Sequence, residues 1–542
     1  MRQLDPSRGP RRLWDRRRTI MSSMRPVQSF VPSELAVIAS LCIWGLILRL
    51  PFFFPATIGW DESTLIVMGQ GILDGFLPYE KIWQNKPPLA FALFAGAIGL
   101  FGKTVVALRF VGCLCVILTS YLVYRASCLI TQNKVSAGVA ALVSISMTSL
   151  LEPEIMTEIL CVVPLSAALL LLFSDDIRPV RAFLVGLLIG VAVMIRTNLA
   201  VVALAAGAFV IFRPSLLPFS RLFAKGFAYA AGVMLVIATT SIPYLIAGRD
   251  ELWFDSVVRA GIEFSSHRRS LRNLLDLVGV AFGIGPDGST SHSILLLGVL
   301  LWIGGLVGLS RCAGRWGALS KPLRNGIIAA SVFLFGATIS VVMTGPPFGH
   351  YLVQLIPWFA IFLGVVIDSR STKILRWLPV AGIGVVLVGV AIGSTQRSYE
   401  LLLQRMERGK SLAYGTAYEI ADYLQTEDES GGSLYMASDH LVYWLLGAYP
   451  PTRLSTHPSN IAKPELVAVI EGPNATPESE MRKIVQQRPD FIVKPQSVWY
   501  LSGLPEVVRF LEESIARDYT LKTVIEGRQI YQRKPDPGLR PL

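Results

Sequence analysis

The chain has 542 residues, of which 52% are hydrophobic and only 16% are charged. This composition excludes an ordinary soluble globule, because too little polar surface remains to face water. The formal net charge of +12 at pH 7 does not indicate nucleic-acid binding. The basic residues sit in short loops between apolar runs, where they set the orientation of a membrane protein.

The N-terminal segment, residues 1–34, is strongly basic and precedes the first apolar run, Leu35 to Phe54. Its arginines are Arg2, Arg8, Arg11, Arg12, Arg16, Arg17, Arg18 and Arg25. Under the positive-inside rule the N-terminus is cytoplasmic. No small-residue cleavage pattern follows Phe54, so we predict an uncleaved anchor rather than a signal peptide.

Apolar runs of spanning length recur through residues 35–395, the predicted transmembrane domain. A bilayer core of about 30 Å needs about 20 apolar residues per helix, and the pattern gives about eleven helices. This total divides 181–212 into two short helices around Arg196, because a single helix would move the next basic loop to the outer side. The cytoplasmic basic loops are then 125–134, 178–181, 213–225, 311–324 and 369–376.

The last region, residues 396–542, changes to short alternating apolar runs. The runs at 433–437 and 490–494 predict strands, and the last two runs flank Gly527 and Arg528 as in a β-hairpin. An odd number of spans places the region on the outer side of the membrane. We therefore predict a soluble, periplasmic α/β domain. All six cysteines precede it, so no disulfide framework or zinc cluster is indicated.

The first outer loop, residues 56–100, begins with a pair of carboxylates, Asp61 and Glu62. An ionised carboxylate at the interface reaches both water and a substrate hydroxyl, so both are candidate general bases or metal ligands. A solvated helix cap is the alternative. The following residues, 63–73, have an amphipathic pattern suited to the membrane interface.

The same loop contains Lys86, directly before Pro87 and Pro88. Rigid backbone at the two prolines would hold the lysine ammonium at the bilayer edge, where it suits a lipid phosphate. Ordinary snorkelling of the side chain to the interface is the alternative.

The order of acidic pair, interfacial helix, GFLPY and NKPPL in residues 59–91 resembles the integral-membrane glycosyltransferases of the GT-C superfamily. The resemblance is to the branch with protein O-mannosyltransferases, the lipid A aminoarabinose transferase and rhizobial galacturonosyltransferases. It implies a polyprenyl-phosphate-linked sugar donor, an outer acceptor and inversion at the anomeric carbon. Asp61 matches the catalytic aspartate of the family, Glu62 its acidic neighbour and Lys86 the lysine associated with the donor phosphate.

The resemblance also assigns residues outside the first loop. Glu158 is the best match for an acidic residue of the second outer loop, with Glu154 as the alternative, and helical spacing puts the two on one face. Arg196 follows a glycine-rich helix, and an arginine at membrane depth suggests an anionic partner. His350 and Tyr351 resemble a basic–Tyr pair that would meet the phosphate. Purely structural roles at helix ends are the alternative for each.

The outer loop 248–292 carries several arginines, although the positive-inside rule disfavours them there. Arg259, Arg268 and Arg269 would attract phosphorylated or carboxylated glycans, so they are candidate acceptor-binding residues. A solvated face balanced by neighbouring acidic residues is the alternative.

These observations predict a polytopic α-helical membrane protein of GT-C type in a bacterial inner membrane. The expected activity is an inverting transfer of a sugar from a polyprenyl phosphate to an envelope acceptor such as lipopolysaccharide, lipid A or another glycan. Mg²⁺ or Mn²⁺ at Asp61 and Glu62 is left open, because paired carboxylates suit such ions. A secondary transporter and a non-catalytic lipid-binding or assembly subunit are the alternative functions.

Overall fold

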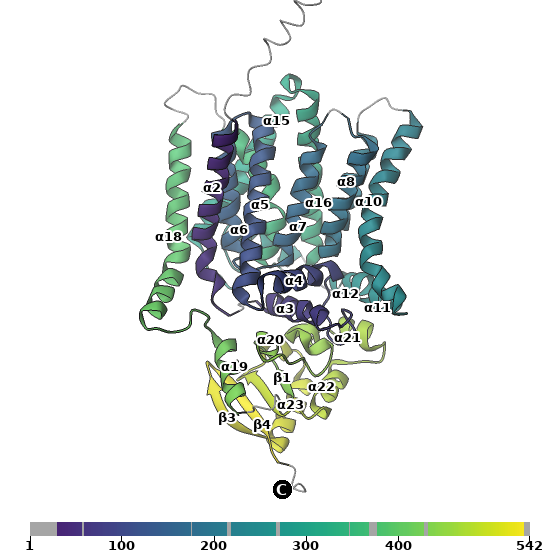
Figure 1. Cartoon of the computed structure of the whole chain (residues 1–542), viewed down its shortest axis with the longest axis vertical. Coiled ribbons are helices and arrows are strands. Elements are labelled where there is room, and N and C mark those ends of the chain that lie inside the picture. Colours follow the sequence, from purple (N-terminus) through teal and green to yellow (C-terminus); the bar gives the residue numbers. More distant parts are fainter. Residues whose placement is uncertain are drawn as a thin grey trace, which may run out of the picture.

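The computed structural model of the chain describes residues 30–56, 59–174, 176–213, 218–266, 271–345, 347–367, 377–427 and 432–535. The arginines of the basic N-terminal segment and the predicted basic loop 369–376 lie outside these ranges. Within them a helical bundle occupies one part of the molecule, and a smaller domain with a sheet covers one end of the bundle (Figure 1).

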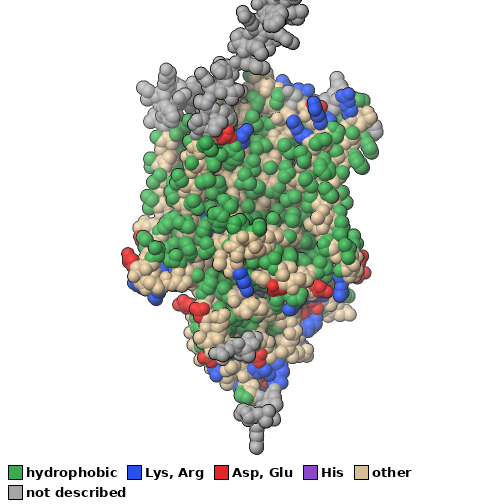
Figure 2. Space-filling view, in the orientation of Figure 1, with side chains coloured by type: hydrophobic (Ala, Val, Ile, Leu, Met, Phe, Trp, Pro, Cys, Tyr) green, Lys and Arg blue, Asp and Glu red, His purple; other side chains and the backbone are tan. Residues whose placement is uncertain are grey.

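The bundle consists of long apolar helices and shorter ones packed among them. Seven helices within the described ranges are long and apolar enough to cross a bilayer, and Figure 2 shows a broad apolar belt between two ends that carry charged side chains. The chain is therefore a multi-pass membrane protein. The bundle helices are α2 (Phe30–Arg49), α5 (Val105–Thr131), α6 (Lys134–Leu151), α7 (Thr157–Leu172), α8 (Pro179–Ile195), α9 (Ala200–Phe212), α10 (Phe219–Ile246), α14 (His292–Gly298), α15 (Gly304–Gly314), α16 (Lys321–Thr344), α17 (Ile356–Ile367) and α18 (Trp377–Glu407).

The region 181–212 is divided as the sequence predicts. Helix α8 ends at Ile195, Arg196 is extended with φ −145° and ψ 110°, and α9 follows a short turn of 3-10 helix. The glycines of α8 serve packing, because a Cβ on Gly186 would lie 2.1 Å from the carbonyl oxygen of Tyr229 in α10. This close approach of two helices fixes the end of α8 and hence the position of Arg196.

Several short helices lie at the end of the bundle that faces the sheet domain (Figure 1). They are α3 (Trp60–Leu73), α4 (Pro88–Phe101), α11 (Asp250–Phe254) and α12 (Ala260–Ser266), and α13 (Leu271–Ala281) follows α12 in the chain. The amphipathic interpretation of 63–73 is wrong, because α3 is buried along most of its length. It lies between the bundle and the C-terminal domain (Figure 1).

The C-terminal domain contains a four-stranded sheet in the order β1-β2-β4-β3. Strand β1 is parallel to β2, and the other pairs are antiparallel. The predicted hairpin is present, but its turn is formed by Glu526 and Gly527, one residue earlier than predicted, and both have positive φ. The elements are α19 (Thr416–Glu427), β1 (Leu434–Met436), α20 (Leu441–Leu446), α21 (Pro464–Glu471), α22 (Pro477–Gln486), β2 (Phe491–Pro495), α23 (Pro505–Asp518), β3 (Tyr519–Ile525) and β4 (Arg528–Arg533).

The predicted domain boundary at 395/396 falls inside α18, which continues to Glu407. The next described element, α19, packs with the C-terminal domain. This domain contacts the short helices directly, since Trp444 donates from Nε1 to Gln70 of α3 at 3.1 Å. The backbone N–H of Trp83 also donates to the carbonyl oxygen of Arg453 at 3.0 Å.

Candidate active site

The loop between α3 and α4 holds Lys86 by its backbone. The buried ring of Tyr79, a residue with φ +72°, donates its hydroxyl hydrogen bond to the carbonyl oxygen of Lys86. Pro87 is the N-cap of α4 and Pro88 its first residue, as a fixed proline φ and a missing N–H favour at a helix start. The rigidity that the two prolines predict is thus reinforced by a side chain.

Asp61, in the first turn of α3, lies among three side-chain nitrogen atoms from two segments, the α3–α4 loop and the C-terminal domain. Its Oδ1 accepts from Gln84 Nε2 at 3.2 Å and lies 3.3 Å from His457 Nε2. Its Oδ2 lies 3.8 Å from Lys86 Nζ. The carboxylate keeps 24% of its side-chain surface exposed, so it is held in place and still accessible.

These neighbours keep the Asp61 carboxyl ionised. Burial alone raises the pKa of this carboxyl, but the Lys86 ammonium and the hydrogen bond from His457 outweigh burial and hold the pKa well below its usual range. Asp61 is therefore a carboxylate at any physiological pH, the form that a proton acceptor requires.

Glu62 points to a different part of the molecule. Its carboxylate is fully buried, and Arg109 of α5 contacts it with Nε at 3.0 Å and Nη2 at 2.6 Å. The backbone N–H of Ile155 donates to it at 3.1 Å. Arg109 also pairs with Glu154 at 3.1 Å. The structure thus assigns Glu62 to a buried ion pair that joins α3, α5 and the α6–α7 loop, and does not bring it to Asp61.

The second predicted acidic residue, Glu158, lies in a separate cluster at the start of α7. Arg196 pairs with its Oε1 and donates to Thr157 Oγ1 at 2.8 Å. His350 Nε2 lies 3.7 Å from the same carboxylate. The expectation that Glu154 and Glu158 share a helix face is wrong, because α7 begins at Thr157 and Glu154 precedes it in the loop.

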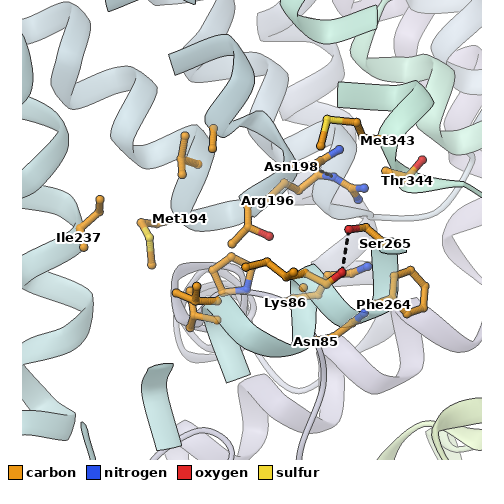
Figure 3. Close-up of a pocket in the computed structure, with 18 of the residues that line it drawn as sticks. Asn85, Lys86, Met194, Arg196, Asn198, Ile237, Phe264, Ser265, Met343 and Thr344 are labelled. Carbon is orange, nitrogen blue, oxygen red and sulfur yellow. Dashed lines mark hydrogen bonds between the residues drawn. The ribbon is translucent and has the colours of Figure 1, made fainter. Parts of the chain in front are cut away.

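Lys86, Arg196 and Tyr351, three of the residues assigned to the donor phosphate, line one cavity of about 400 Å³. The Arg196 guanidinium carbon lies 5.3 Å from the centre of the Tyr351 ring. The remaining wall is largely apolar and comes from α8, α10, α12 and α16, with Met194, Ile237, Phe264 and Met343 among its residues. Figure 3 shows Lys86 and Arg196 in this cavity. Two cations in an apolar wall suit the phosphate of a lipid.

The structure gives little support for acceptor binding by the arginines of the loop 248–292. The Arg259 side chain is 60% exposed and lies 3.5 Å from Asp255 one helical turn before it, which is the predicted solvated arrangement. Arg268 and Arg269 lie outside the described residues.

Asp61 and Glu62 do not form a shared metal site as they stand. Asp61 is engaged by Gln84, Lys86 and His457, whereas Glu62 is engaged by Arg109. Within the part of the chain that the structure describes, no three His, Cys, Asp or Glu side chains are grouped to hold an ion. The paired carboxylates that suggested Mg²⁺ or Mn²⁺ are therefore not brought together as a pair.

Sequence reasoning missed three residues that shape the site: Gln84, Arg109 and His457. Gln84 directly precedes the NKPPL segment, and this proximity was the available clue. Arg109 is an arginine inside an apolar run, a costly placement that calls for an acidic partner. His457 had no local clue, because its contact with Asp61 exists only after the C-terminal domain packs on α3.

Residues 85–246 match the family described as dolichyl-phosphate-mannose-protein mannosyltransferase. The crystal structure of ArnT from Cupriavidus metallidurans bound to undecaprenyl phosphate is similar to this chain, with a TM-score of 0.58 and 15% identity. The similarity covers 93% of this chain and 98% of that one. The chain has the GT-C fold. The apo structure of the same ArnT matches the GT-C fold of this chain equally well, with a TM-score of 0.58 and 15% identity over 93% and 98% of the two chains.

The archaeal oligosaccharyltransferase AglB from Archaeoglobus fulgidus matches with a TM-score of 0.49 and 12% identity, over 94% of this chain and 75% of that one. No curated protein matches the sequence. The GT-C resemblance drawn from residues 59–91 is confirmed, and the family match within 85–246 contains Lys86, Glu158 and Arg196. The family match and the GT-C fold together support glycosyltransferase activity.

Proposed function

We propose that the chain is an inverting glycosyltransferase that takes a sugar from a polyprenyl phosphate and transfers it to a glycan or glycolipid of the cell envelope. One observation carries the proposal. The cations of Lys86 and Arg196 stand in an apolar cavity, and the ionised carboxylate of Asp61 lies 3.8 Å from the Lys86 ammonium. A phosphate site and a proton acceptor are therefore adjacent.

In this reaction Asp61 acts as the general base. The acceptor hydroxyl gives its proton to the carboxylate as its oxygen forms a bond to the anomeric carbon of the sugar. The bond from that carbon to the phosphate oxygen breaks, and its electron pair leaves with the polyprenyl phosphate. Because the acceptor attacks opposite the leaving group, configuration inverts and no covalent enzyme intermediate is needed.

Lys86 stabilises the charge that develops on the departing phosphate. Its backbone is fixed by Tyr79 and the two prolines, and its ammonium lies 3.8 Å from Asp61, so little reorganisation is needed when the charge appears. Arg196 supplies a second cation, and Tyr351 covers its guanidinium plane. The apolar wall formed by residues such as Met194 and Ile237 suits the first isoprene units of the lipid.

His350 and Glu158 belong to the surroundings of this phosphate site. Glu158 neutralises part of the Arg196 charge within the protein. The nearby His350 Nε2 makes no hydrogen bond within the described ranges. We assign to His350 the role of a hydrogen-bond donor that turns to the phosphate when the lipid is bound. We assign to Glu158 the orientation of Arg196 rather than proton transfer.

The proposed setting is the periplasmic face of a bacterial inner membrane, with lipopolysaccharide, lipid A or another envelope glycan as the acceptor. The support is the position of α3, which carries Asp61, at the end of the bundle covered by the C-terminal domain (Figure 1). An odd number of spans from a cytoplasmic N-terminus puts that end outside.

The test uses membranes from a strain that lacks the gene, because they retain both the unused donor and the unmodified acceptor. Purified protein is added, and lipid A, lipopolysaccharide and other glycans are followed by mass spectrometry. We expect one component to gain the mass of a single sugar while polyprenyl phosphate is released. Envelope glycans that are identical in the deletion and parent strains, and that gain no mass on addition of the protein, would contradict the proposal.

A further inference from the structure

We propose that His457 of the C-terminal domain is a positioning residue for Asp61, through which that domain completes the active site. His457 donates from Nε2 to Asp61 Oδ1, and thereby leaves Oδ2 of the same carboxylate for the acceptor hydroxyl. This inference rests on the proposed function, because it concerns the geometry of the proposed base.

The hydrogen bonds of the imidazole fix its tautomer. The backbone N–H of Ser459 donates to His457 Nδ1 at 3.2 Å, so Nδ1 must present a lone pair. A neutral imidazole with a lone pair on Nδ1 carries its proton on Nε2. Nε2 lies 3.3 Å from Asp61 Oδ1, and a carboxylate only accepts. His457 is therefore the donor in this contact.

The surroundings also keep the ring neutral. Burial lowers the pKa of His457, and the cations of Lys463 and Lys86 act in the same direction, whereas Asp61 raises it. A proton on Nδ1 would in addition face the Ser459 N–H. A neutral donor orients the carboxylate without competing with Asp61 for the proton of the acceptor.

The loop that carries His457 is built onto the first outer loop. The backbone N–H of Trp83 donates to Arg453 O at 3.0 Å and to Thr456 Oγ1 at 3.2 Å. Thr64 of α3 donates to the carbonyl oxygen of Thr456 at 3.3 Å. Thr456, which takes part in two of these contacts, directly precedes His457 in the chain. The imidazole is therefore placed by backbone and buried side chains, as a preorganised site requires.

The ring has a further contact that limits its rotation. Trp60, the residue before Asp61, meets the His457 ring edge to face with centroids 5.9 Å apart. Trp60 in turn stacks on Trp499 of the C-terminal domain at 5.2 Å. The aromatic side chains beside the Asp61–His457 contact, Trp60 and Trp499, are thus packed between α3 and the C-terminal domain.

The two oxygen atoms of Asp61 consequently differ. Gln84 Nε2 donates to Oδ1 at 3.2 Å and His457 Nε2 lies 3.3 Å from the same oxygen, whereas the Lys86 ammonium lies 3.8 Å from Oδ2. Oδ2 is therefore the oxygen left for the acceptor hydroxyl, on the side of the Lys86 ammonium. Loss of the His457 donor would let the carboxylate rotate, and misorientation of a base reduces turnover more than binding.

The test compares His457→Ala, His457→Asn and His457→Gln in the assay with membranes from the deletion strain. The glutamine Nε2 reaches the position of the imidazole Nε2, whereas the shorter asparagine does not. We expect Ala and Asn to reduce kcat by about ten- to hundredfold, the loss that a charge-assisted hydrogen bond supports. Gln should stay within about fivefold of wild type because it restores the donor. The affinity for undecaprenyl phosphate, titrated in nanodiscs, should be unchanged in all three variants.

A matched control is His292→Ala, which removes an exposed histidine at the start of α14 and should leave kcat as in wild type. Equal rates for the Asn and Gln variants would overturn the inference even if the Ala variant fails to fold, and so would wild-type turnover in His457→Ala. Absence of transfer by the wild-type protein itself would instead refute the proposed function. The two failures are therefore distinguishable.

Discussion

Lys86 has a side chain that faces Asp61 and a cavity, and a backbone that cannot move freely. Its ammonium lies 3.8 Å from the Asp61 carboxylate and its side chain is only 13% exposed. A snorkelling lysine would be free to follow the interface, whereas this one is fixed by Tyr79 and by Pro87. The physical consequence is a point charge in a defined place, which is what stabilisation of a leaving phosphate needs.

Lys86→Ala should weaken the binding of undecaprenyl phosphate about ten- to hundredfold, because a charge-assisted contact of about 1.5 to 3 kcal/mol is lost. Lys86→Arg should recover part of the affinity but less of the turnover, since its planar fork places the charge differently. Titration of purified protein in nanodiscs checks both variants. Lys103→Ala is the control, because Lys103 follows the end of α4 and does not line the cavity. Unchanged affinity in Lys86→Ala would remove Lys86 from the phosphate site.

The same lysine sets the pH response of the site. Burial raises the pKa of Asp61, and Lys86 is the largest of the influences that lower it well below its usual range. Removal of the ammonium must therefore raise this pKa. We expect the acid limb of the pH–rate profile to move to higher pH in Lys86→Ala, whereas Lys86→Arg should keep it near the wild-type position. Residual turnover measured between pH 4 and 8 tests this, and coincident acid limbs for the Ala variant and wild type would refute it.

At the scale of elements, Arg109 joins segments that are far apart in the chain. It contacts Glu62 of α3 and Glu154 of the α6–α7 loop, and it donates to the carbonyl oxygens of Phe52 and Pro55. Arg49 at the end of α2 binds the carbonyl oxygens of the same α6–α7 loop, with Glu152 O at 2.8 Å. Glu62, the neighbour of the candidate base Asp61, is thus part of a buried network of ion pairs and hydrogen bonds that fixes α3.

Arg109→Ala should destabilise the protein by about 3 to 5 kcal/mol, because it leaves two buried carboxylates without their cation. Glu62→Gln should cost less and should retain turnover per folded molecule. Thermal unfolding in detergent, together with kcat of the folded fraction, separates the roles. A Glu62→Gln variant with normal thermal stability and no turnover would show that Glu62 takes part in the chemistry.

Elements with a local pattern were predictable from the sequence. The apolar runs predicted the spans, and the interruption at Arg196 predicted the division between α8 and α9. Two local patterns misled. Residues 63–73 read as amphipathic although both faces of α3 are covered, and the spacing of Glu154 and Glu158 suggested one helix although the chain is extended before Thr157. In both cases tertiary packing overrode the periodicity.

At the scale of the whole molecule, the site is assembled from the first outer loop, the bundle and the C-terminal domain. The contact of Thr64 with Thr456 joins residues 392 positions apart. A single sequence holds no local record of such a contact, which is why Asp61 and Lys86 could be proposed from a motif while His457 could not. For the same reason the sequence does not indicate that Arg109 is the partner of Glu62.

The topology predicts opposite sides for the two ends of the bundle. Reporter fusions after Arg213 and Ser369 should lack alkaline phosphatase activity, because both positions are expected in the cytoplasm, and a fusion after Lys494 in β2 should have it. Green fluorescent protein at the same positions provides the complementary readout. Phosphatase activity at either of the first two positions, or none at the third, would contradict the orientation.

The role of Asp61 as the general base is tested most directly by single-turnover transfer in Asp61→Asn, compared with wild type at a saturating amount of membranes from the deletion strain. Asparagine keeps the size of the side chain but cannot take the proton of the acceptor hydroxyl, so we expect a loss of about 10²-fold or more in the rate of sugar transfer. Undecaprenyl phosphate should still bind, and the thermal unfolding temperature should be close to that of wild type. A wild-type rate of transfer in Asp61→Asn would show that this carboxylate is not the base and that the proposed active site is wrong.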